Sequence, residues 1–172
     1  MAHRSHWTAR LNKYSPCGEA VKWARGYPSL QAAWDACERG DWMLWLLGSV
    51  VGGEVGSPER RRLVQAVCEC ARLALPYVPA GEEGRRRAIE TAEAWARGEA
   101  TLDQVRAAGV WAWAARAAGG RVGAAGAAGA AAGAAWAAAE DAGATAEDAG
   151  AWAGAAVLRQ CAGIVRRHYP EA

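Results

Sequence analysis

The segment SPCGEAVKWARGYPSLQAAWDACERGDWMLWLLGSVV, residues 15–51, decides the fold because it contains three helix starts in succession. Helices are predicted at residues 16–25, 30–39 and 42–51. A residue type that caps helix N-termini precedes each of them (Ser15, Ser29 and Asp41). Glycine, the usual C-terminal stop, follows the first two (Gly26 and Gly40). The segment therefore predicts three short helices joined by minimal turns.

The same kinds of signal continue downstream to residue 104. A Ser-Pro start predicts a fourth helix over residues 58–75, and a glycine end predicts a fifth over residues 83–97. Thr101 and Gln104 are spaced as a capping box, in which each side chain bonds the backbone N–H of the other. A further helix is therefore expected to begin there.

Beyond residue 104 alanine dominates, with 27 alanines among residues 107–156. Five glycines spaced three or four apart would form one stripe without side chains on a helix: Gly120, Gly123, Gly126, Gly129 and Gly133. Packed helices are favoured over a flexible linker because four tryptophans recur nearby, at Trp111, Trp113, Trp136 and Trp152. Whether residues 119–156 form one helix or two stays open. The apolar spacing of residues 157–165 predicts a final amphipathic helix.

These patterns predict an all-α protein of six to eight helices, arranged as an antiparallel bundle or a solenoid-like array. No segment alternates β-branched and polar residues, so no sheet is expected. Residues 1–12 are predicted to be a mobile lead-in. Residues 13–172 are predicted to form one helical domain, with a short-helix half (13–98) and a long-helix half rich in Ala, Gly and Trp (99–172).

The cysteine content and the N-terminal sequence favour a cytoplasmic protein. The five cysteines are odd in number and lack framework spacing, and the N-terminus has no apolar signal-peptide region. The uncharged stretch 122–139 is long enough to cross a membrane, but it consists mostly of alanine and glycine, so no membrane association is predicted. A net charge of +2 does not favour a nucleic-acid partner.

Catalytic and metal-binding patterns are weak. His3 and His6 lie in the lead-in and His168 lies near the C-terminus, so no histidine is placed to serve as a general base. Cys68 and Cys70 form C-x-C, and on a helix their side chains point about 200° apart. No catalytic residue, metal or cofactor is predicted, and the cysteines are interpreted as small buried hydrophobes.

Acidic residues and tryptophans supply the candidate contacts with a partner. Trp34, Trp42 and Trp45 are interpreted either as core or as a Trp-lined surface pocket or binding hot spot. The acidic residues are interpreted either as a solvated face or as part of a partner-binding surface. The predicted partner-binding residues are Asp35, Glu38, Asp41, Trp42, Trp45, Glu140, Asp141, Glu147 and Asp148. Two arginine triplets, 60–62 and 85–87, fit a solvated face better than phosphate contacts.

Residues 17–30 and 33–46, followed by the Cys161–Pro170 tail, resemble the immunity protein family with the immunity-five-like domain, found in bacteria and phages. The resemblance is specific over residues 14–47 and compositional over 100–170, and the glycine-rich 119–133 region departs from it. It implies a protein that neutralises a toxin or another protein by binding it, and it brings no catalytic residues.

The sequence thus predicts a non-enzymatic protein whose partner is a toxin or a host protein. One alternative is a structural protein that self-associates into a homo-oligomer through the glycine stripe. A third is a metal-dependent enzyme that uses the carboxylates of Asp35 and Glu38 or those at 140–148.

Overall fold

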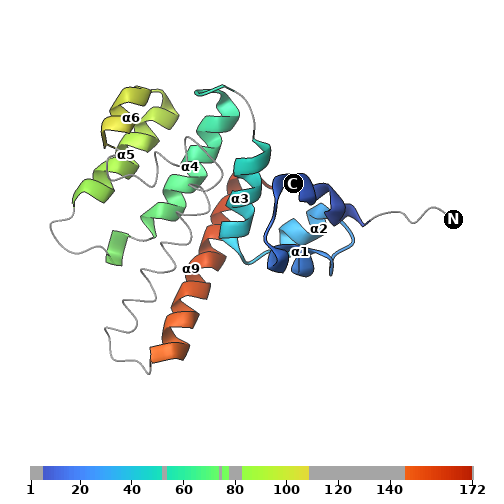
Figure 1. Cartoon of the computed structure of the whole chain (residues 1–172). Coiled ribbons are helices and arrows are strands. Elements are labelled where there is room, and N and C mark those ends of the chain that lie inside the picture. Colours follow the sequence, from blue (N-terminus) through green and yellow to red (C-terminus); the bar gives the residue numbers. More distant parts are fainter. Residues whose placement is uncertain (1–5, 52–53, 74, 78–82, 109–145, 172) are drawn as a thin grey trace.

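The computed structural model describes residues 6–51, 54–73, 75–77, 83–108 and 146–171, and these residues are all-α without a strand (Figure 1). The N-terminal part contains the 3-10 helix η1 (Trp7–Tyr14) and helices α1 (Gly18–Ala24), α2 (Leu30–Ala36) and α3 (Gly40–Val50). The remaining elements are α4 (Pro58–Arg72), η2 (Leu75–Tyr77), α5 (Glu83–Arg97), α6 (Leu102–Ala108) and α9 (Ala146–His168). The predicted fold class is confirmed over this part of the chain.

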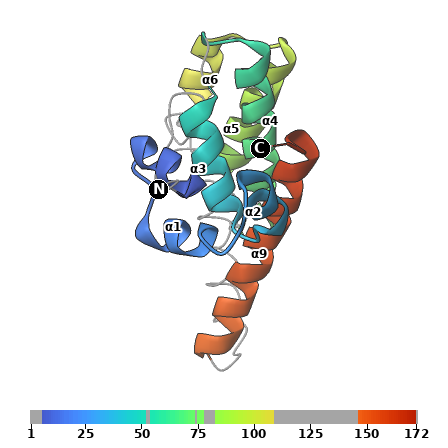
Figure 2. The ribbon, with the colours of Figure 1, turned by 90° about the vertical axis from the view of Figure 1, so that its right-hand side faces the viewer.

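Helix α4 lies at the centre of the arrangement, between α5 and α9 (Figures 1 and 2). Helix α6 packs on α5, and α3 packs mainly on α9. The small elements η1, α1 and α2 lie beyond α3, at the opposite end of the molecule from α5 and α6. The chain therefore has a central core between α3, α4 and α9, and an N-terminal region on the other side of α3.

Four of the predicted helix signals are confirmed by hydrogen bonds or backbone angles. Ser29 Oγ accepts from the N–H of Ala32, and Ser57 Oγ accepts from the N–H of Arg60. The capping box of Thr101 and Gln104 is complete, with both reciprocal bonds formed, at 2.7 and 3.2 Å. Gly98 follows α5 with a φ of +85°, the left-handed conformation that glycine adopts without strain.

The start of the first helices differs from the prediction. Residues 7–14 form η1, where a mobile lead-in was predicted for 1–12; Thr8 is buried and His6 caps the helix. Ser15 is not an N-cap but closes η1, in the left-handed region at φ 56°. Helix α1 consequently begins at Gly18, two residues after Pro16.

The boundary between the next two helices also differs. Helix α2 ends at Ala36, three residues before the predicted end, and Gly40 is the first residue of α3 rather than a C-terminal stop. The N-cap of α3 is Arg39, so the predicted capping role of Asp41 is wrong. The reason is tertiary: a Cβ at position 40 would lie 2.4 Å from the Cβ of Cys161, so only glycine allows α3 to approach α9 this closely.

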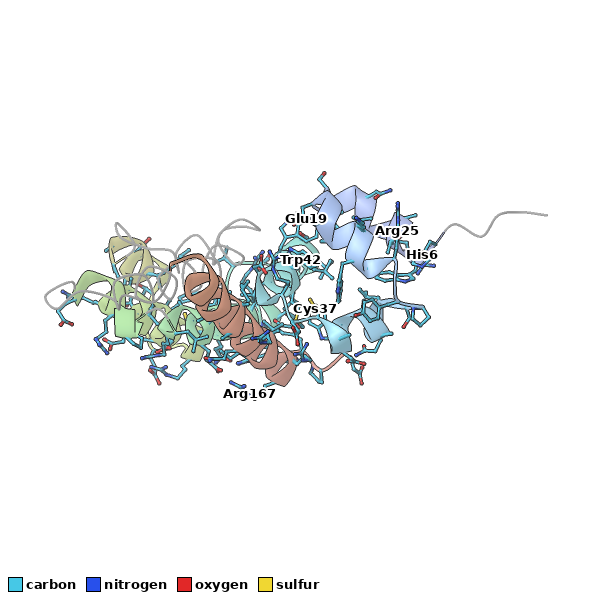
Figure 3. All side chains as sticks on the ribbon, turned by 90° about the horizontal axis from the view of Figure 1, so that it is seen from below. His6, Glu19, Arg25, Cys37, Trp42 and Arg167 are labelled. Atoms are coloured by element: carbon cyan, nitrogen blue, oxygen red, sulfur yellow. The ribbon has the colours of Figure 1, made fainter. Side chains whose placement is uncertain are left out.

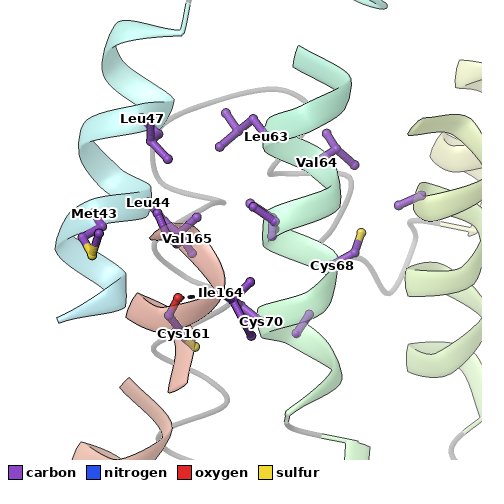
Figure 4. Close-up of a cluster of buried hydrophobic side chains, with 14 of the residues drawn as sticks. Met43, Leu44, Leu47, Leu63, Val64, Cys68, Cys70, Cys161, Ile164 and Val165 are labelled. Atoms are coloured by element: carbon purple, nitrogen blue, oxygen red, sulfur yellow. Dashed lines mark hydrogen bonds between the residues drawn. The ribbon is translucent and has the colours of Figure 1, made fainter. Parts of the chain in front are cut away.

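The centre of the core contains medium-sized side chains without exposed surface, including Leu44, Leu63, Val67 and Val165. Figure 4 shows part of this cluster, to which the buried Trp34 and Trp95 also belong. Cys68 and Cys70 are both buried although they point to different sides of α4. This is possible because α4 has a neighbour on both sides, and the Cys70 thiol faces α9, 3.9 Å from the Cys161 carbonyl. The prediction that the cysteines are buried is confirmed for four of the five and is wrong for Cys17, which is exposed.

The predicted final amphipathic helix is confirmed by α9, in which Val157, Cys161, Ile164 and Val165 are buried. The glycine stripe, the uncharged 122–139 stretch and the question of one helix or two over 119–156 fall largely outside the described residues. Among the helices that are described, none is long and apolar enough to cross a membrane.

Candidate functional site

A half-open cavity of about 60 Å³ lies where η1, α1 and α2 meet α3. Five tryptophans line it: Trp7, Trp23, Trp34, Trp42 and Trp45. The rest of its wall is almost entirely aliphatic, with a contribution from the Cys37 side chain. We call this feature the tryptophan cavity. Figure 3 shows Trp42 and Cys37 at the junction of α3 with the N-terminal helices, away from Arg167.

Hydrogen bonds hold two of the tryptophans in place from outside the cavity. The indole N–H of Trp7 donates to the carbonyl of Tyr27 at 2.8 Å. That of Trp34 donates to the carbonyl of Tyr169 at 2.9 Å, which ties α2 to the C-terminal segment. Trp34 is buried, whereas the other four tryptophans of the cavity are half-buried. Hydrogen bonds therefore hold two of the five tryptophans in place, and four of the five are partly exposed.

Arg166 fixes the wall formed by α2. Its guanidinium donates to the carbonyls of Trp34 (3.1 Å) and Cys37 (2.7 Å) at the end of α2, where the Trp34 carbonyl also accepts from the N–H of Cys37 at 3.3 Å. Gln31 adds a bond from its side-chain amide to the Pro170 carbonyl at 3.1 Å. The end of α9 and the residues after it thus position a helix that lies about 130 residues earlier in the sequence.

Ring contacts and one ion pair form the rim. Trp23 packs at a tilt against Tyr27 and Trp42, with centroid distances of 4.7 and 5.8 Å. The guanidinium of Arg39 lies 4.4 Å from the Trp42 ring centroid and makes two hydrogen bonds, of 2.9 and 2.7 Å, to the Asp41 carboxylate. This bonding raises the pKa of Arg39 above its ordinary value. The rim therefore has an aromatic surface bordered by a fixed charge pair.

Cys37 contributes the cavity's thiol. Burial raises its pKa, and its Sγ–H donates to the Arg39 carbonyl at 3.5 Å. A thiol with a raised pKa is a poor nucleophile at neutral pH, because the thiolate is the reactive form. The lining of the cavity is thus almost entirely apolar.

The predicted partner-binding residues are only partly brought together. Trp42 and Trp45 line the tryptophan cavity, and Asp41 lies at its rim as the partner of Arg39. Asp35 and Glu38 are exposed, and Glu38 lies beyond the end of α2. Asp35 accepts from Gln31 at 2.8 Å, and Glu38 lies 3.7 Å from Arg159.

The second predicted acidic group is only partly covered by the structure. Glu140 and Asp141 lie outside the described residues. The backbone of Glu147 and Asp148 lies in the first turn of α9. Within the described parts of the chain, no three His, Cys, Asp or Glu side chains are grouped so that they could hold a metal ion.

The first arginine triplet has structural contacts that the sequence did not indicate. Arg61 donates to the carbonyls of Gly56 (2.9 Å) and Trp95 (2.8 Å), and so joins the start of α4 to the end of α5. Arg62 stacks on the Tyr169 ring at 4.8 Å. In the second triplet, Arg86 lies 3.7 Å from Glu83. The contacts of Arg61 and Arg62 join α4 to other parts of the fold, whereas the contact of Arg86 lies within α5, and none of them converges on a ligand site.

Sequence reasoning missed Trp7 and Trp23 as cavity residues, and it missed Arg166 as the residue that fixes α2. A weak signal existed for Trp23, because Ala20, Trp23 and Ala24 share the spacing of one helical face. No local signal existed for Trp7 or Arg166, whose partners are 20 and more than 120 residues away.

Comparison with known proteins adds nothing to this geometry: no protein-family model, no curated protein and no solved structure matches the chain. The resemblance to immunity proteins therefore stays a prediction. The physical character of the tryptophan cavity is the main observation that bears on function.

Proposed function

We propose that this protein acts by binding a partner protein, without catalysis, and that the tryptophan cavity is the centre of the interface. The observation that carries the proposal is the set of half-buried tryptophans Trp23, Trp42 and Trp45 around an apolar cavity. Tryptophan and arginine dominate the energetics of protein interfaces, and they do so where they surround a pocket that a partner side chain can fill.

The surroundings of the cavity support a protein partner. Interfaces combine an apolar centre with a polar rim that excludes water. Here the Arg39–Asp41 pair supplies such a rim directly beside Trp42. Asp35 and Glu38 are exposed carboxylates that follow the cavity residues Trp34 and Cys37 in the sequence. The proposed interface thus includes five of the residues predicted from sequence.

The resemblance to immunity proteins supports a toxin or a host protein as the partner. Neutralisation by binding needs no reactive group on the inhibitor, since covering the target's surface is sufficient. This agrees with a cavity whose thiol is held protonated and whose rim carboxylate is ion-paired.

The test is affinity capture from host lysate, read by mass spectrometry, with three matched variants. Trp45→Ala and Leu46→Ala remove parts of the cavity wall, and Leu102→Ala removes an equally half-buried leucine from α6, at the far end of the molecule. Circular dichroism checks that each variant is folded. We expect one stoichiometric protein with the wild type and with Leu102→Ala.

For the cavity variants we expect recovery of that protein to fall at least about tenfold, because a hot-spot residue contributes about 2 kcal/mol or more to binding. Equal recovery with all three variants would place the interface elsewhere. If the recovery of no captured protein falls with the cavity variants, the proposal is wrong.

A further inference from the structure

We propose that residues 166–170, which we call the C-terminal strap, hold the tryptophan cavity in the form that binds the partner. The inference rests on the proposed function and adds how that site is regulated, because the strap and the partner stabilise the same position of α2. It follows from where the strap is anchored, from how it contacts α2, and from the residue of α2 that belongs both to these contacts and to the cavity wall.

The strap is anchored in the core. Ile164 and Val165, the residues directly before it, are buried in the core cluster. The Tyr169 hydroxyl donates to the Glu59 carbonyl at 3.2 Å, and the guanidinium of Arg62 lies 4.8 Å from the Tyr169 ring centroid. Both partners of Tyr169 belong to the first two turns of α4. The strap is therefore attached to the core independently of α2.

The strap contacts both ends of α2. Arg166 binds the C-terminal end through one nitrogen, Nη1, which donates to the carbonyls of Trp34 and Cys37. Gln31, in the first turn, donates from its side chain to the Pro170 carbonyl. Helix α2 has seven residues, and so short a helix is stable only through its tertiary contacts. Release of the strap would therefore loosen the position of α2.

Trp34 belongs both to the strap contacts and to the cavity. Its indole N–H donates to the Tyr169 carbonyl at 2.9 Å, and its ring lines the cavity. Leu30, Ala33 and Cys37 form the rest of the wall that α2 and its C-cap contribute. Because these residues lie on one short helix, the whole wall moves if α2 moves away from the strap. The position of the strap thus determines the shape of the cavity.

Partner binding and docking of the strap are consequently linked. A partner that fits the cavity in its present shape favours the position of α2 in which the strap is bound. Such coupling is reciprocal, so that each event strengthens the other by the same factor. Loss of the strap's bonds should therefore weaken partner binding although the residues that line the cavity are unchanged.

The first measurement is the rate at which N-ethylmaleimide labels Cys37 of the full chain in native buffer, read by peptide mass spectrometry. Cys37 is buried in the cavity wall, so its labelling reports movement of α2, whereas Cys70 is buried in the core and reports opening of the core. Arg166→Met removes the donor for the two carbonyls at the end of α2. We expect it to accelerate the labelling of Cys37 at least tenfold relative to Cys70.

Two matched variants test the role of Arg166. Arg167→Met makes the same change one residue further along, at an exposed arginine that pairs with Glu69 of α4, and should leave Cys37 protected. Arg166→Lys keeps one nitrogen that can donate to both carbonyls, and should restore most of the protection of Cys37. Equal labelling of Cys37 in Arg166→Met and Arg167→Met would contradict a specific role of Arg166.

A second variant avoids damage to α9. Tyr169→Ala leaves α9 and Arg166 intact but removes the ring and the hydroxyl that anchor the strap on α4. It should accelerate the labelling of Cys37 at least threefold and leave Cys70 protected. Labelling of Cys37 at the wild-type rate in both Arg166→Met and Tyr169→Ala would overturn the proposal. Equal acceleration at Cys37 and Cys70 in Tyr169→Ala would also overturn it, because the strap would then hold the whole fold.

Affinity capture from host lysate separates this proposal from the proposed function. If Arg166→Met reduces recovery of the cavity-dependent protein at least fivefold and Arg167→Met does not, then the strap controls binding. If Trp45→Ala loses the partner while Arg166→Met retains it, then the interface proposal holds and the proposed control by the strap is wrong. If Arg166→Met exposes Cys37 while Trp45→Ala still captures every protein, then the strap holds the cavity and the interface proposal fails.

Discussion

The central core and the N-terminal region share helix α3 but pack against its two sides in different ways. On one side, Leu44 and Leu47 meet medium-sized side chains of α4 and α9, and Leu44 is fully buried. On the other side, Trp42, Trp45 and Leu46 are half-buried and line a cavity. One helix therefore joins a close-packed interior to an incompletely filled one.

The difference follows from the residue types. Leucine, valine and cysteine interdigitate and leave little free space, and the close approach of α3 to α9 at Gly40 adds backbone contact. Indole rings are large and rigid, so several of them cannot fill a small volume evenly. The core is stabilised by close packing, whereas the N-terminal region is packed less closely and contains the tryptophan cavity.

The largest expected effect is that of breaking the close approach in the core. Gly40→Ala places a methyl group 2.4 Å from the Cys161 Cβ and 2.7 Å from the Ala162 backbone nitrogen, which cannot move aside independently of α9. We expect the free energy of unfolding to fall by about 3 kcal/mol or more, as measured by urea denaturation.

The control for that variant lies on α9 itself. A methyl group on Gly163 meets nothing within 4 Å, so Gly163→Ala should stabilise the protein by up to about 1 kcal/mol through helix propensity. If Gly163→Ala destabilises the protein as much as Gly40→Ala does, then the close contact at Gly40 does not explain the loss of stability.

The same substitution on the two sides of α3 compares the regions directly. Leu44→Ala should cost about 3 kcal/mol because it leaves a void in a fully buried site, whereas Leu46→Ala should cost about 1 kcal/mol because that site is half-exposed beside an existing cavity. The measurement is urea denaturation of both variants. Equal costs would contradict the view that the two sides of α3 are packed differently.

Local signals predicted much of the core's framework from sequence. Ser57, Pro58 and the Thr101–Gln104 box act through atoms within three residues of each other, so the sequence contains the whole interaction. The stripe of Val157, Cys161 and Ile164 likewise indicated the buried face of α9. Such features can be predicted without knowing the tertiary structure.

The candidate site was predictable only in part, because its geometry is tertiary. Trp42 and Trp45 were recognised from their spacing on one helix, but their convergence with Trp7 and Trp34 depends on how η1 and α2 dock. Gly40 showed the same limitation: a glycine after a helical pattern indicates a helix end, and only the contact with α9 explains why it begins α3 instead.

Alkaline pH should destabilise the core through the buried Cys68 and the half-buried Tyr169. Burial raises the pKa of Cys68 from about 9 to about 12, and that of Tyr169 from about 10 to about 12. Because the folded state holds these protons more tightly than the unfolded state, the stabilisation is complete below pH 9. Above pH 9 the Cys68 thiol ionises in the unfolded state, and the stabilisation from this group decreases. The same happens to the Tyr169 hydroxyl above pH 10.

We expect the free energy of unfolding to fall between pH 9 and 11 by no more than about 1.4 kcal/mol per pH unit for each such group. Urea denaturation across this range measures the slope. Cys68→Ala should flatten the slope between pH 9 and 10, and Cys17→Ala, which changes an exposed side chain, should not alter it. An unchanged slope in Cys68→Ala would mean that the buried thiol does not control the alkaline response.

The cysteines also report whether the two regions open together. Cys17 is exposed and should react with a thiol reagent in the native protein, whereas the four buried cysteines should not. Cys37 belongs to the tryptophan cavity, while Cys68 and Cys70 lie in the core with no exposed surface.

Because looser packing favours local opening, Cys37 should lose protection at a lower urea concentration than Cys70, as measured by pulse labelling and mass spectrometry. If both lose protection together, the N-terminal region and the core unfold as one unit, and the tryptophan cavity is held as firmly as the close-packed interior beside it.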